Sequence, residues 1–279
     1  MGIQDFFVDS FLYFFLAGKH SRENDCIYML APDYTPQILR RDGLPPCPPH
    51  HIRLVVISDT HDRHHAIGML PAADVFIHCG DILMTNKFYT EKVAIKKLQK
   101  FNHWLTTIDA RYKLVIAGNH DHIIEKLGVA KTKTLLHNGV YLENELFSID
   151  DINIFASPIS LSTKSFNNAF QGKEYEEETI KLCTNDIHID ILITHGPPKF
   201  ILDLSHNKNH ELEYCGDRAL FKKVLEVEPK FHLFGHIHNS EDCYNQGIRK
   251  YNNTTFINSS VVTDGKFGKL SSNGNIFEI

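Results

Sequence analysis

The sequence predicts a layered α/β domain, because short apolar segments of strand character alternate with segments of helical spacing. The strand segments are dominated by apolar residues instead of alternating with polar ones, which is typical of strands buried on both faces. They are residues 52–57, 75–78, 114–117, 152–156, 189–194 and 231–234. Strands of this kind that alternate with helices favour a sheet covered by helices.

Two helices and two closing strands complete the predicted domain. Residues 91–105 place Phe101 and Leu105 at helical spacing, and residues 217–227 form a second helical segment. Near the C-terminus, residues 254–258 and 275–278 have the character of strands.

The chain divides at a proline-rich segment, residues 45–49, which can form neither a helix nor a central strand. We therefore expect an N-terminal arm, residues 1–50, that packs on a catalytic domain formed by residues 51–279. Within the arm, residues 3–16 are predicted to form an amphipathic helix that packs on the domain. The apolar stretch at 11–18 is too short to span a bilayer, so no membrane association is expected.

Composition limits the class of protein. With 279 residues, of which 42% are hydrophobic and 23% charged, the chain has the composition of an ordinary globular domain. The formal net charge of −5 and the lack of long basic runs argue against general nucleic-acid binding. The six cysteines include no Cys-x-x-Cys pair, which favours reduced thiols and a cytoplasmic location. The 18 histidines are unusual, and they direct attention to metal binding.

Residues that can bind metals follow five of the predicted strands, at the sheet edge where open α/β sheets bind ligands. Each short motif alone would often be an ordinary loop, but five of them at one edge indicate a shared site. The motif residues are Asp59 and His61, Asp81, Asn119 to Asp121, His195, and His236 and His238. Carboxylate, imidazole and amide donors without thiolate suit Mn²⁺, Fe or Zn²⁺, and their number suits two ions that share a carboxylate.

These motifs resemble those of the calcineurin-like metallophosphoesterase superfamily: Asp-x-His, Gly-Asp, Gly-Asn-His-(Asp/Glu), His and Gly-His-x-His, in the same order over about residues 52–260. The resemblance implies a four-layer αββα sandwich and an enzyme, a phosphoesterase that uses two divalent metal ions. By the same resemblance, the ions would be held by two sets of ligands, with Asp81 bridging both: Asp59, His61 and His238 in one, and Asn119, His195 and His236 in the other.

The resemblance also implies catalytic roles for Asp81 and His120. A hydroxide bridging the two metals would attack phosphorus in line, and His120 would protonate the leaving oxygen or stabilise the transition state. The neutral amide of Asn119 would limit negative charge where the anionic substrate binds. Arg63 and His64 follow the first metal loop and could neutralise phosphate oxygens, although they could equally belong to a solvated loop.

Other segments resemble the MPPED family of small metallophosphodiesterases. They are residues 157–158, 194–198, 202–203, 234–238 and 256–258. The resemblance implies a small phosphodiester substrate, with cyclic nucleotides among the candidates. Some relatives lack the last histidine of Gly-His-x-His and turn over poorly, whereas this chain retains His238. We therefore expect an active enzyme.

The sequence departs from the pattern of protein serine/threonine phosphatases. Their Gly-Asp motif continues as Asp-Arg-Gly, whereas Asp81 is followed here by Ile82 and Leu83. The phosphate-clamping arginine is therefore missing, as is the aspartate that partners the catalytic histidine. Three alternatives remain: a phosphomonoesterase, a weakly catalytic nucleotide-binding regulator, and, disfavoured by the net acidic charge, a DNA nuclease.

Overall fold

Two β-sheets form the centre of the structure, a computed structural model that describes residues 25–29, 36–84, 88–162, 168–172, 177, 187–240, 243–263, 270 and 273–279. The helix predicted for residues 3–16 lies outside these residues. Among the residues that are described, no helix is long and apolar enough to cross a membrane.

The first sheet has seven strands in the order β2-β1-β15-β3-β4-β5-β6, and β3, β4, β5 and β6 are parallel neighbours. Its strands are β1 (Asp25–Met29), β2 (Pro36–Arg40), β3 (Arg53–Ile57), β4 (Ala73–Cys79), β5 (Ala110–Ile116), β6 (Val140–Tyr141) and β15 (Asn275–Glu278). Strands β1 and β2 are antiparallel and form an N-terminal hairpin. The C-terminal strand β15 lies between this hairpin and β3, so the two ends of the described chain meet in this sheet.

The second sheet has six strands in the order β13-β14-β12-β9-β8-β7, and β8, β9, β12 and β14 are parallel neighbours. Its strands are β7 (Glu145–Ile149), β8 (Ile152–Ser157), β9 (Ile191–Thr194), β12 (Phe231–Phe234), β13 (Gly247–Tyr251) and β14 (Thr254–Asn258). A separate two-stranded hairpin consists of β10 (Leu204–His206) and β11 (Leu212–Tyr214).

Three α-helices are described: α2 (Glu91–Trp104), α3 (His122–Leu135) and α5 (Arg218–Val227). Three short 3-10 helices are η2 (Arg41–Gly43), η3 (His64–Ala66) and η4 (Leu105–Thr107). Asp217 begins α5 as predicted, since its carboxylate accepts hydrogen bonds from the backbone N–H groups of Ala219 and Leu220.

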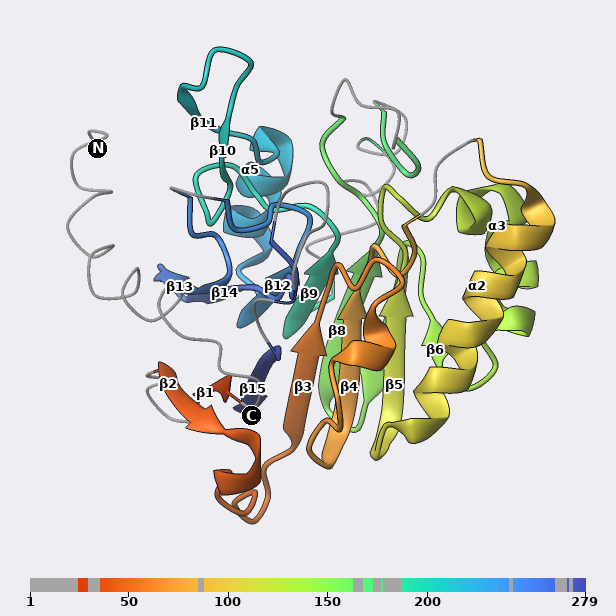
Figure 1. Cartoon of the computed structure of the whole chain (residues 1–279). Coiled ribbons are helices and arrows are strands. Elements are labelled where there is room, and N and C mark those ends of the chain that lie inside the picture. The colour runs from red at the N-terminus through yellow and green to blue at the C-terminus, as the bar shows by residue number, and fades with distance from the viewer. Residues whose placement is uncertain are drawn as a thin grey trace.

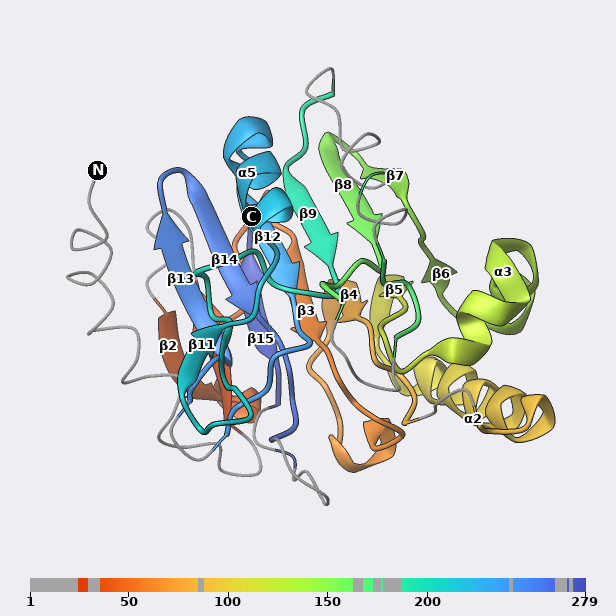
Figure 2. The ribbon, with the colours of Figure 1, turned by 90° about the horizontal axis from the view of Figure 1, so that it is seen from above.

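The sheets and helices form four layers, with the two sheets in the middle (Figures 1 and 2). Helices α2 and α3 cover the outer face of the first sheet, and α5 covers the outer face of the second. On β3, Leu54 and Val56 point into the core between the sheets, whereas Val55 and Ile57 pack toward the helices. Both faces of the strand are buried, which explains why its apolar residues do not alternate with polar ones. The predicted four-layer αββα sandwich is confirmed.

The N-terminal hairpin is joined to the first sheet through a buried network of charged and polar side chains. Arg53 on β3 forms an ion pair with Glu278 on β15, and the hydroxyl of Tyr28 on β1 donates to the same carboxylate at 2.9 Å. Burial and the bond to Glu278 raise the pKa of Tyr28 to about 12. Strands β1 and β2 therefore continue the sheet of the predicted catalytic domain, whereas the domain division at residue 50 stays a prediction.

Candidate metal centre

The five motif loops meet where β3, β4, β5, β9 and β12 end, between the two sheets. Parallel strands carry their C-terminal ends to the same edge, so residues far apart in sequence become neighbours there. Among the described residues, three groups of side chains have ligand atoms within 4.8 Å of one another. They are Asp59 with His61 and His238, His61 with Asp81 and His120, and Asp81 with His195 and His236.

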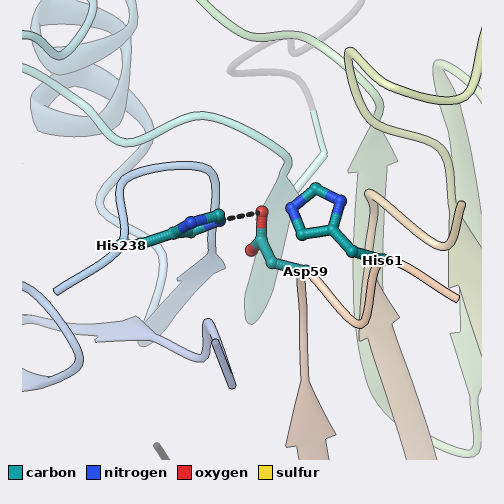
Figure 3. A group of neighbouring side chains, drawn as sticks. All are labelled: Asp59, His61 and His238. Carbon is teal, nitrogen blue, oxygen red and sulfur yellow. Dashed lines mark hydrogen bonds and ion pairs between the residues drawn. The ribbon is translucent and has the colours of Figure 1, made fainter. Parts of the chain in front are cut away.

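The first half-site, which we define as Asp59, His61 and His238, joins both sheets (Figure 3). Asp59 and His61 follow β3, whereas His238 follows β12 of the second sheet. One carboxylate oxygen of Asp59, Oδ1, lies 3.0 Å from His238 Nε2. The rings of His61 and His238 stand edge to face, with centroids 5.3 Å apart, so that the three side chains surround a common point.

The second half-site, which we define as Asn119, His195 and His236, is organised by the amide oxygen of Asn119. Asn119 Oδ1 lies 3.0 Å from His195 Nε2 and 2.8 Å from His236 Nδ1. His195 is held from its other side, because its Nδ1 lies 2.9 Å from the backbone oxygen of Cys79. A ligating imidazole whose second nitrogen bonds to a carbonyl is fixed in both tautomer and orientation.

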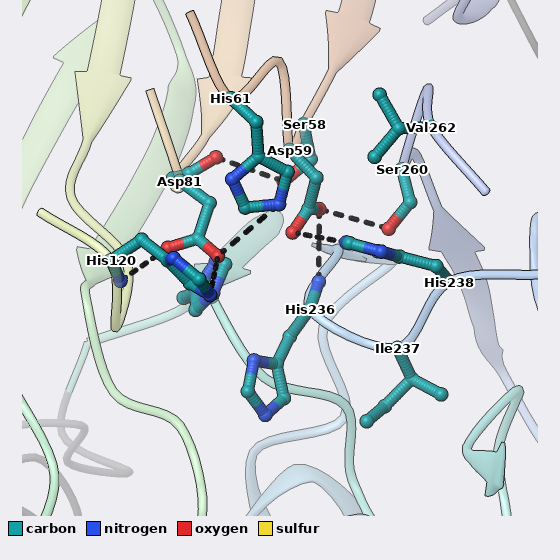
Figure 4. A network of polar contacts seen from close by, with 12 residues as sticks. Ser58, Asp59, His61, Asp81, His120, His236, Ile237, His238, Ser260 and Val262 are labelled. Atoms are coloured by element: carbon teal, nitrogen blue, oxygen red, sulfur yellow. Dashed lines mark hydrogen bonds and ion pairs between the residues drawn. The ribbon is translucent and has the colours of Figure 1, made fainter. Parts of the chain in front are cut away.

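Asp81 lies close to both half-sites, and Figure 4 shows it beside His61 and His120. Its Oδ1 is 3.4 Å from His195 Nε2, and its Oδ2 is 3.8 Å from His61 Nε2. The carboxylate is buried and faces a histidine of each half-site. A carboxylate in this position is within reach of both half-sites.

The backbone of the centre is unusual. Asp59, His61, Asp81 and His236 have positive φ angles of 57°, 44°, 54° and 69°. Residues other than glycine seldom adopt this left-handed conformation, and such strain concentrates at functional sites. The surrounding loops thus hold these four residues in a strained conformation at the centre.

Two motif glycines leave room for the carboxylates. A Cβ atom at Gly118 would overlap Asp81 Oδ1, and one at Gly235 would overlap Asp59 Oδ2. Both carboxylates thus lie directly against the backbone of the neighbouring loops. The glycines of these motifs are required by close packing, which explains why the motifs contain them.

The charged groups of the centre shift one another's pKa values. Burial would raise the pKa of Asp81, but His195, His120 and His61 hold it well below its ordinary range. Burial also opposes charge on His195, yet Asp81, Asp59 and the backbone oxygen of Cys79 together raise the pKa of His195 to about 9. The buried carboxylates therefore stabilise positive charge at this point.

Divalent cations fit this arrangement of donors. Burial lowers the pKa of His61 to about 4, so its imidazole is neutral near pH 7 and can act as a ligand. His61 Nδ1 is buried and finds no hydrogen-bond partner among the described residues. Imidazoles, buried carboxylates and one amide oxygen match the ligand preferences of Mn²⁺, Fe and Zn²⁺, as the sequence predicts.

His120 lies beside the first half-site and Asp81. Its backbone N–H donates to Asp81 Oδ1 at 2.8 Å, and its ring stands edge to face against His61 at a centroid distance of 4.7 Å. The ring Nε2 is 4.0 Å from Asp81 Oδ2. The side chain is partly exposed, which leaves a face open to a substrate.

The two residues predicted to neutralise phosphate oxygens have different surroundings. His64 is buried on η3, where its ring contacts those of Phe101 and Trp104 with centroids 5.3 Å away in each case. Burial lowers its pKa to about 4. This placement favours packing over phosphate binding for His64. Arg63 precedes η3 and is partly exposed, and its substrate role stays a prediction.

Asp121 has a role that its motif alone does not reveal. Its buried carboxylate accepts hydrogen bonds from the backbone N–H groups of Ile82, Leu83 and Gly118 at 3.2, 2.9 and 2.8 Å. It therefore ties the loop of Asp81 to the loop that carries Asn119. The sequence signal was an acidic residue directly after the predicted acid His120, in a position that becomes fully buried.

Comparisons with known proteins agree with this geometry. Residues 52–240 match the family described as calcineurin-like phosphoesterase. Metallophosphoesterase domain-containing protein 1 of Homo sapiens is 32% identical over 255 residues, covering 82% of this chain and 72% of that protein. The chain belongs to the calcineurin-like phosphoesterase family. The predicted similarity to the MPPED group is likewise confirmed.

Two further proteins resemble this calcineurin-like phosphoesterase. UPF0046 protein K07C11.7 of Caenorhabditis elegans is 32% identical over 237 residues, covering 80% of this chain and 73% of that protein. The solved structure of TT1561 from Thermus thermophilus shares the fold, with a TM-score of 0.50 and 10% identity over 74% of this chain and 88% of that one. The chain is thus a metal-dependent phosphoesterase with a phosphate-ester substrate. The roles of its individual site residues stay predictions.

Proposed function

We propose that this protein hydrolyses a small phosphodiester with the help of two divalent cations. The observation that carries the proposal is the position of Asp81, whose two carboxylate oxygens face His195 of the second half-site and His61 of the first. Two bound cations would activate water near neutral pH and stabilise the charge of the phosphate oxygens. The first half-site would hold one cation and the second half-site the other.

A diester fits the electrostatics better than a monoester. A diester has one negative charge, whereas a phosphate monoester carries nearly two near pH 7. The residues after Asp81 are Ile82 and Leu83, and both are fully buried in the apolar core. No arginine follows the motif to clamp a second phosphate charge, which supports a substrate with a single charge. Cyclic nucleotides are candidates within this class.

Three residues of the centre have further roles in the proposed reaction. His120, partly exposed beside the first half-site, donates a proton to the leaving oxygen. Asn119 contributes a neutral oxygen, so the second half-site keeps more positive charge for the phosphate than a carboxylate would leave. Asp81 fixes the spacing of the two half-sites and orients His120 through the backbone N–H of that residue.

Mn²⁺ is the metal we propose for activity in solution, since a mixed oxygen and nitrogen donor set accommodates it. We also propose a cytoplasmic location. Cys26, Cys47, Cys79, Cys215 and Cys243 are free thiols among the described residues, which agrees with a reducing compartment.

Hydrolysis of two model esters tests the proposal. Metal-stripped protein is assayed with bis-p-nitrophenyl phosphate and p-nitrophenyl phosphate, with and without added Mn²⁺. We expect Mn²⁺-dependent cleavage that favours the diester and falls on the order of a thousandfold in Asp81→Ala, because both cations lose their shared ligand. Asp151→Ala, at an exposed turn, is the matched control and should retain activity.

The outcomes separate the competing functions. Preference for the monoester would identify a phosphomonoesterase. Binding of two Mn²⁺ ions without cleavage of either ester would favour a nucleotide-binding regulator. Full activity in Asp81→Ala would contradict the two-metal proposal.

A further inference from the structure

The segment that follows β14 connects the two sheets beneath the metal centre. The backbone N–H of Ser259 donates to Phe234 O at the end of β12, at 2.8 Å. Two residues later, the N–H of Val261 donates to Ser58 O just past β3, at 3.0 Å. Ser260 lies between these bonds, paired with Ser58 in an isolated parallel bridge. Hydrogen bonds to both sheets therefore fix the backbone on either side of Ser260.

The side chain of Ser260 reaches Asp59 of the first half-site. Its hydroxyl donates to Asp59 Oδ2 at 2.9 Å, and the backbone N–H of His236 donates to the same oxygen, also at 2.9 Å (Figure 4). Asp59 and Ser260 are both buried. The other oxygen, Oδ1, faces His238 Nε2 at 3.0 Å. The two oxygens of Asp59 thus have different partners.

We propose that Ser260 is a positioning residue for metal binding in the first half-site, an inference that rests on the two-metal function proposed above. Two donors occupy Asp59 Oδ2, and the backbone of Gly235 lies directly against it. Oδ1 is consequently the oxygen presented to a cation, between His61 and His238. Loss of the hydroxyl frees one side of Oδ2 and lets the carboxylate turn away from this geometry.

The second half-site provides an internal comparison. Its ligands His195 and His236 contact Asn119, and His195 also contacts Cys79 O and Asp81. Within the described part of the chain, the hydroxyl of Ser260 bonds to Asp59 and not to these side chains, so its removal should affect the two half-sites unequally.

Titration of the metal-free full-length protein with Mn²⁺ in a calorimeter tests the role of Ser260. Ser260→Thr and Ser260→Val have the same shape, and only threonine keeps the hydroxyl. We expect Ser260→Val to weaken one of the two Mn²⁺ sites by about 10- to 100-fold, the range for lost outer partners of metal ligands. Ser260→Thr should bind close to wild type. Ser260→Ala also removes the hydroxyl, without adding volume, and should weaken Mn²⁺ binding as Ser260→Val does.

Two further variants test whether Ser260 affects Mn²⁺ affinity through the carboxylate of Asp59. Ser259→Ala removes a neighbouring buried hydroxyl that accepts a hydrogen bond from the Asn275 side chain at 3.0 Å, and it should leave both affinities unchanged. Combined with Asp59→Asn, Ser260→Ala should cause little additional loss, because both changes act on the same carboxylate.

Equal Mn²⁺ affinities in wild type and in Ser260→Ala would overturn the proposal, as would an equal loss in Ser259→Ala. A wild-type protein that binds no Mn²⁺ would instead overturn the proposed two-metal function. Metal binding is measured without substrate, so the two failures are distinguishable.

Discussion

The two half-sites differ in charge, although each combines two imidazoles with one oxygen donor. In the first, the oxygen belongs to the Asp59 carboxylate, which lies 3.0 Å from His238. In the second, the corresponding oxygen is the amide of Asn119, 3.0 Å from His195 and 2.8 Å from His236. The shared Asp81 adds one negative charge to both.

This difference in charge favours different roles for cations in the two half-sites. In the proposed two-metal centre, a cation in the first half-site would be offset by two carboxylates, whereas one in the second would be offset by Asp81 alone. The second cation would therefore keep more net positive charge with which to attract a phosphate oxygen. Burial would raise the pKa of Asp59, but His238 and His195 hold it below its ordinary range, so this carboxylate stays charged at neutral pH.

Substitution of His120 is expected to reduce activity strongly, to an extent comparable with Asp81→Ala. His120→Asn keeps the backbone N–H that donates to Asp81 and removes the imidazole beside the first half-site. We expect kcat to fall by about 10²- to 10⁴-fold, the usual contribution of a general acid, with Mn²⁺ binding unchanged. The measurement pairs steady-state kinetics on the diester with calorimetric Mn²⁺ titration. Lost metal binding would show that His120 acts as a ligand instead.

Neutralising Asp59 should remove most of the charge difference between the half-sites. Asp59→Asn keeps the shape of the side chain but leaves only Asp81 to offset a cation in the first half-site. We expect Mn²⁺ affinity at one site to fall on the order of a hundredfold, while the other site changes little. Calorimetric titration with Mn²⁺ resolves the two affinities. An equal fall at both sites would contradict the assigned ligand sets.

The reverse substitution, Asn119→Asp, should have a smaller and opposite effect on binding. The added charge strengthens Mn²⁺ affinity at the second half-site by about tenfold, because the cation then meets two carboxylates. Turnover of the diester should fall, since less positive charge remains for the phosphate. Affinity comes from calorimetry and turnover from initial rates at saturating Mn²⁺. Faster turnover would refute the proposed advantage of a neutral ligand.

Much of the centre could be predicted from the sequence because parallel strands bring their C-terminal ends together. Five loops that each followed an apolar segment were enough to identify Asp59, Asp81 and His195 as neighbours. The apolar runs also predicted the central strands, and helical spacing predicted α2 and α5. The predicted bounds agree with the structure to within a few residues.

Other features depend on contacts that leave no local pattern. The helix α3 was not predicted, and within it Gly128 has φ 71° and ψ 170°, which interrupts the helical backbone. The short strand β1 is stabilised by pairing with β15, more than 200 residues away in the chain, and β2 pairs with β1. Burial of His64 results from packing against Phe101 and Trp104, which a motif-based interpretation could not detect.

The sheets themselves offer a further comparison, since each carries a buried threonine–histidine pair near the metal loops. In the first sheet, His78 Nε2 lies 3.0 Å from Thr60 Oγ1, and His78 Nδ1 accepts the N–H of Gly80 at 3.3 Å. In the second, His232 Nε2 lies 2.8 Å from Thr194 Oγ1, and its Nδ1 has no hydrogen-bond partner among the described residues. Only the second histidine can therefore be replaced without breaking a backbone contact.

His232→Phe should make the stability of the protein less sensitive to acid. Burial lowers the pKa of His232 from its ordinary 6.5 to about 3, so the unfolded chain binds a proton more readily than the folded protein. The stability contributed by the neutral ring is present above pH 6.5 and is lost as the pH falls toward 3. Between about pH 6 and 4, this one group should lower the free energy of unfolding by about 1.4 kcal/mol per pH unit.

Urea unfolding at pH 7, 6, 5 and 4 in the presence of a chelator measures this dependence, because metal release then contributes nothing. The phenylalanine variant should lose less stability between pH 6 and 4 than the wild type, by about 1.4 kcal/mol for each unit. His78→Phe should instead lower stability already at pH 7, since it leaves the N–H of Gly80 without its acceptor. Parallel pH profiles for wild type and His232→Phe would mean that His232 is protonated equally in the folded and unfolded states, contrary to its burial on the second sheet beside Phe234 and Phe256.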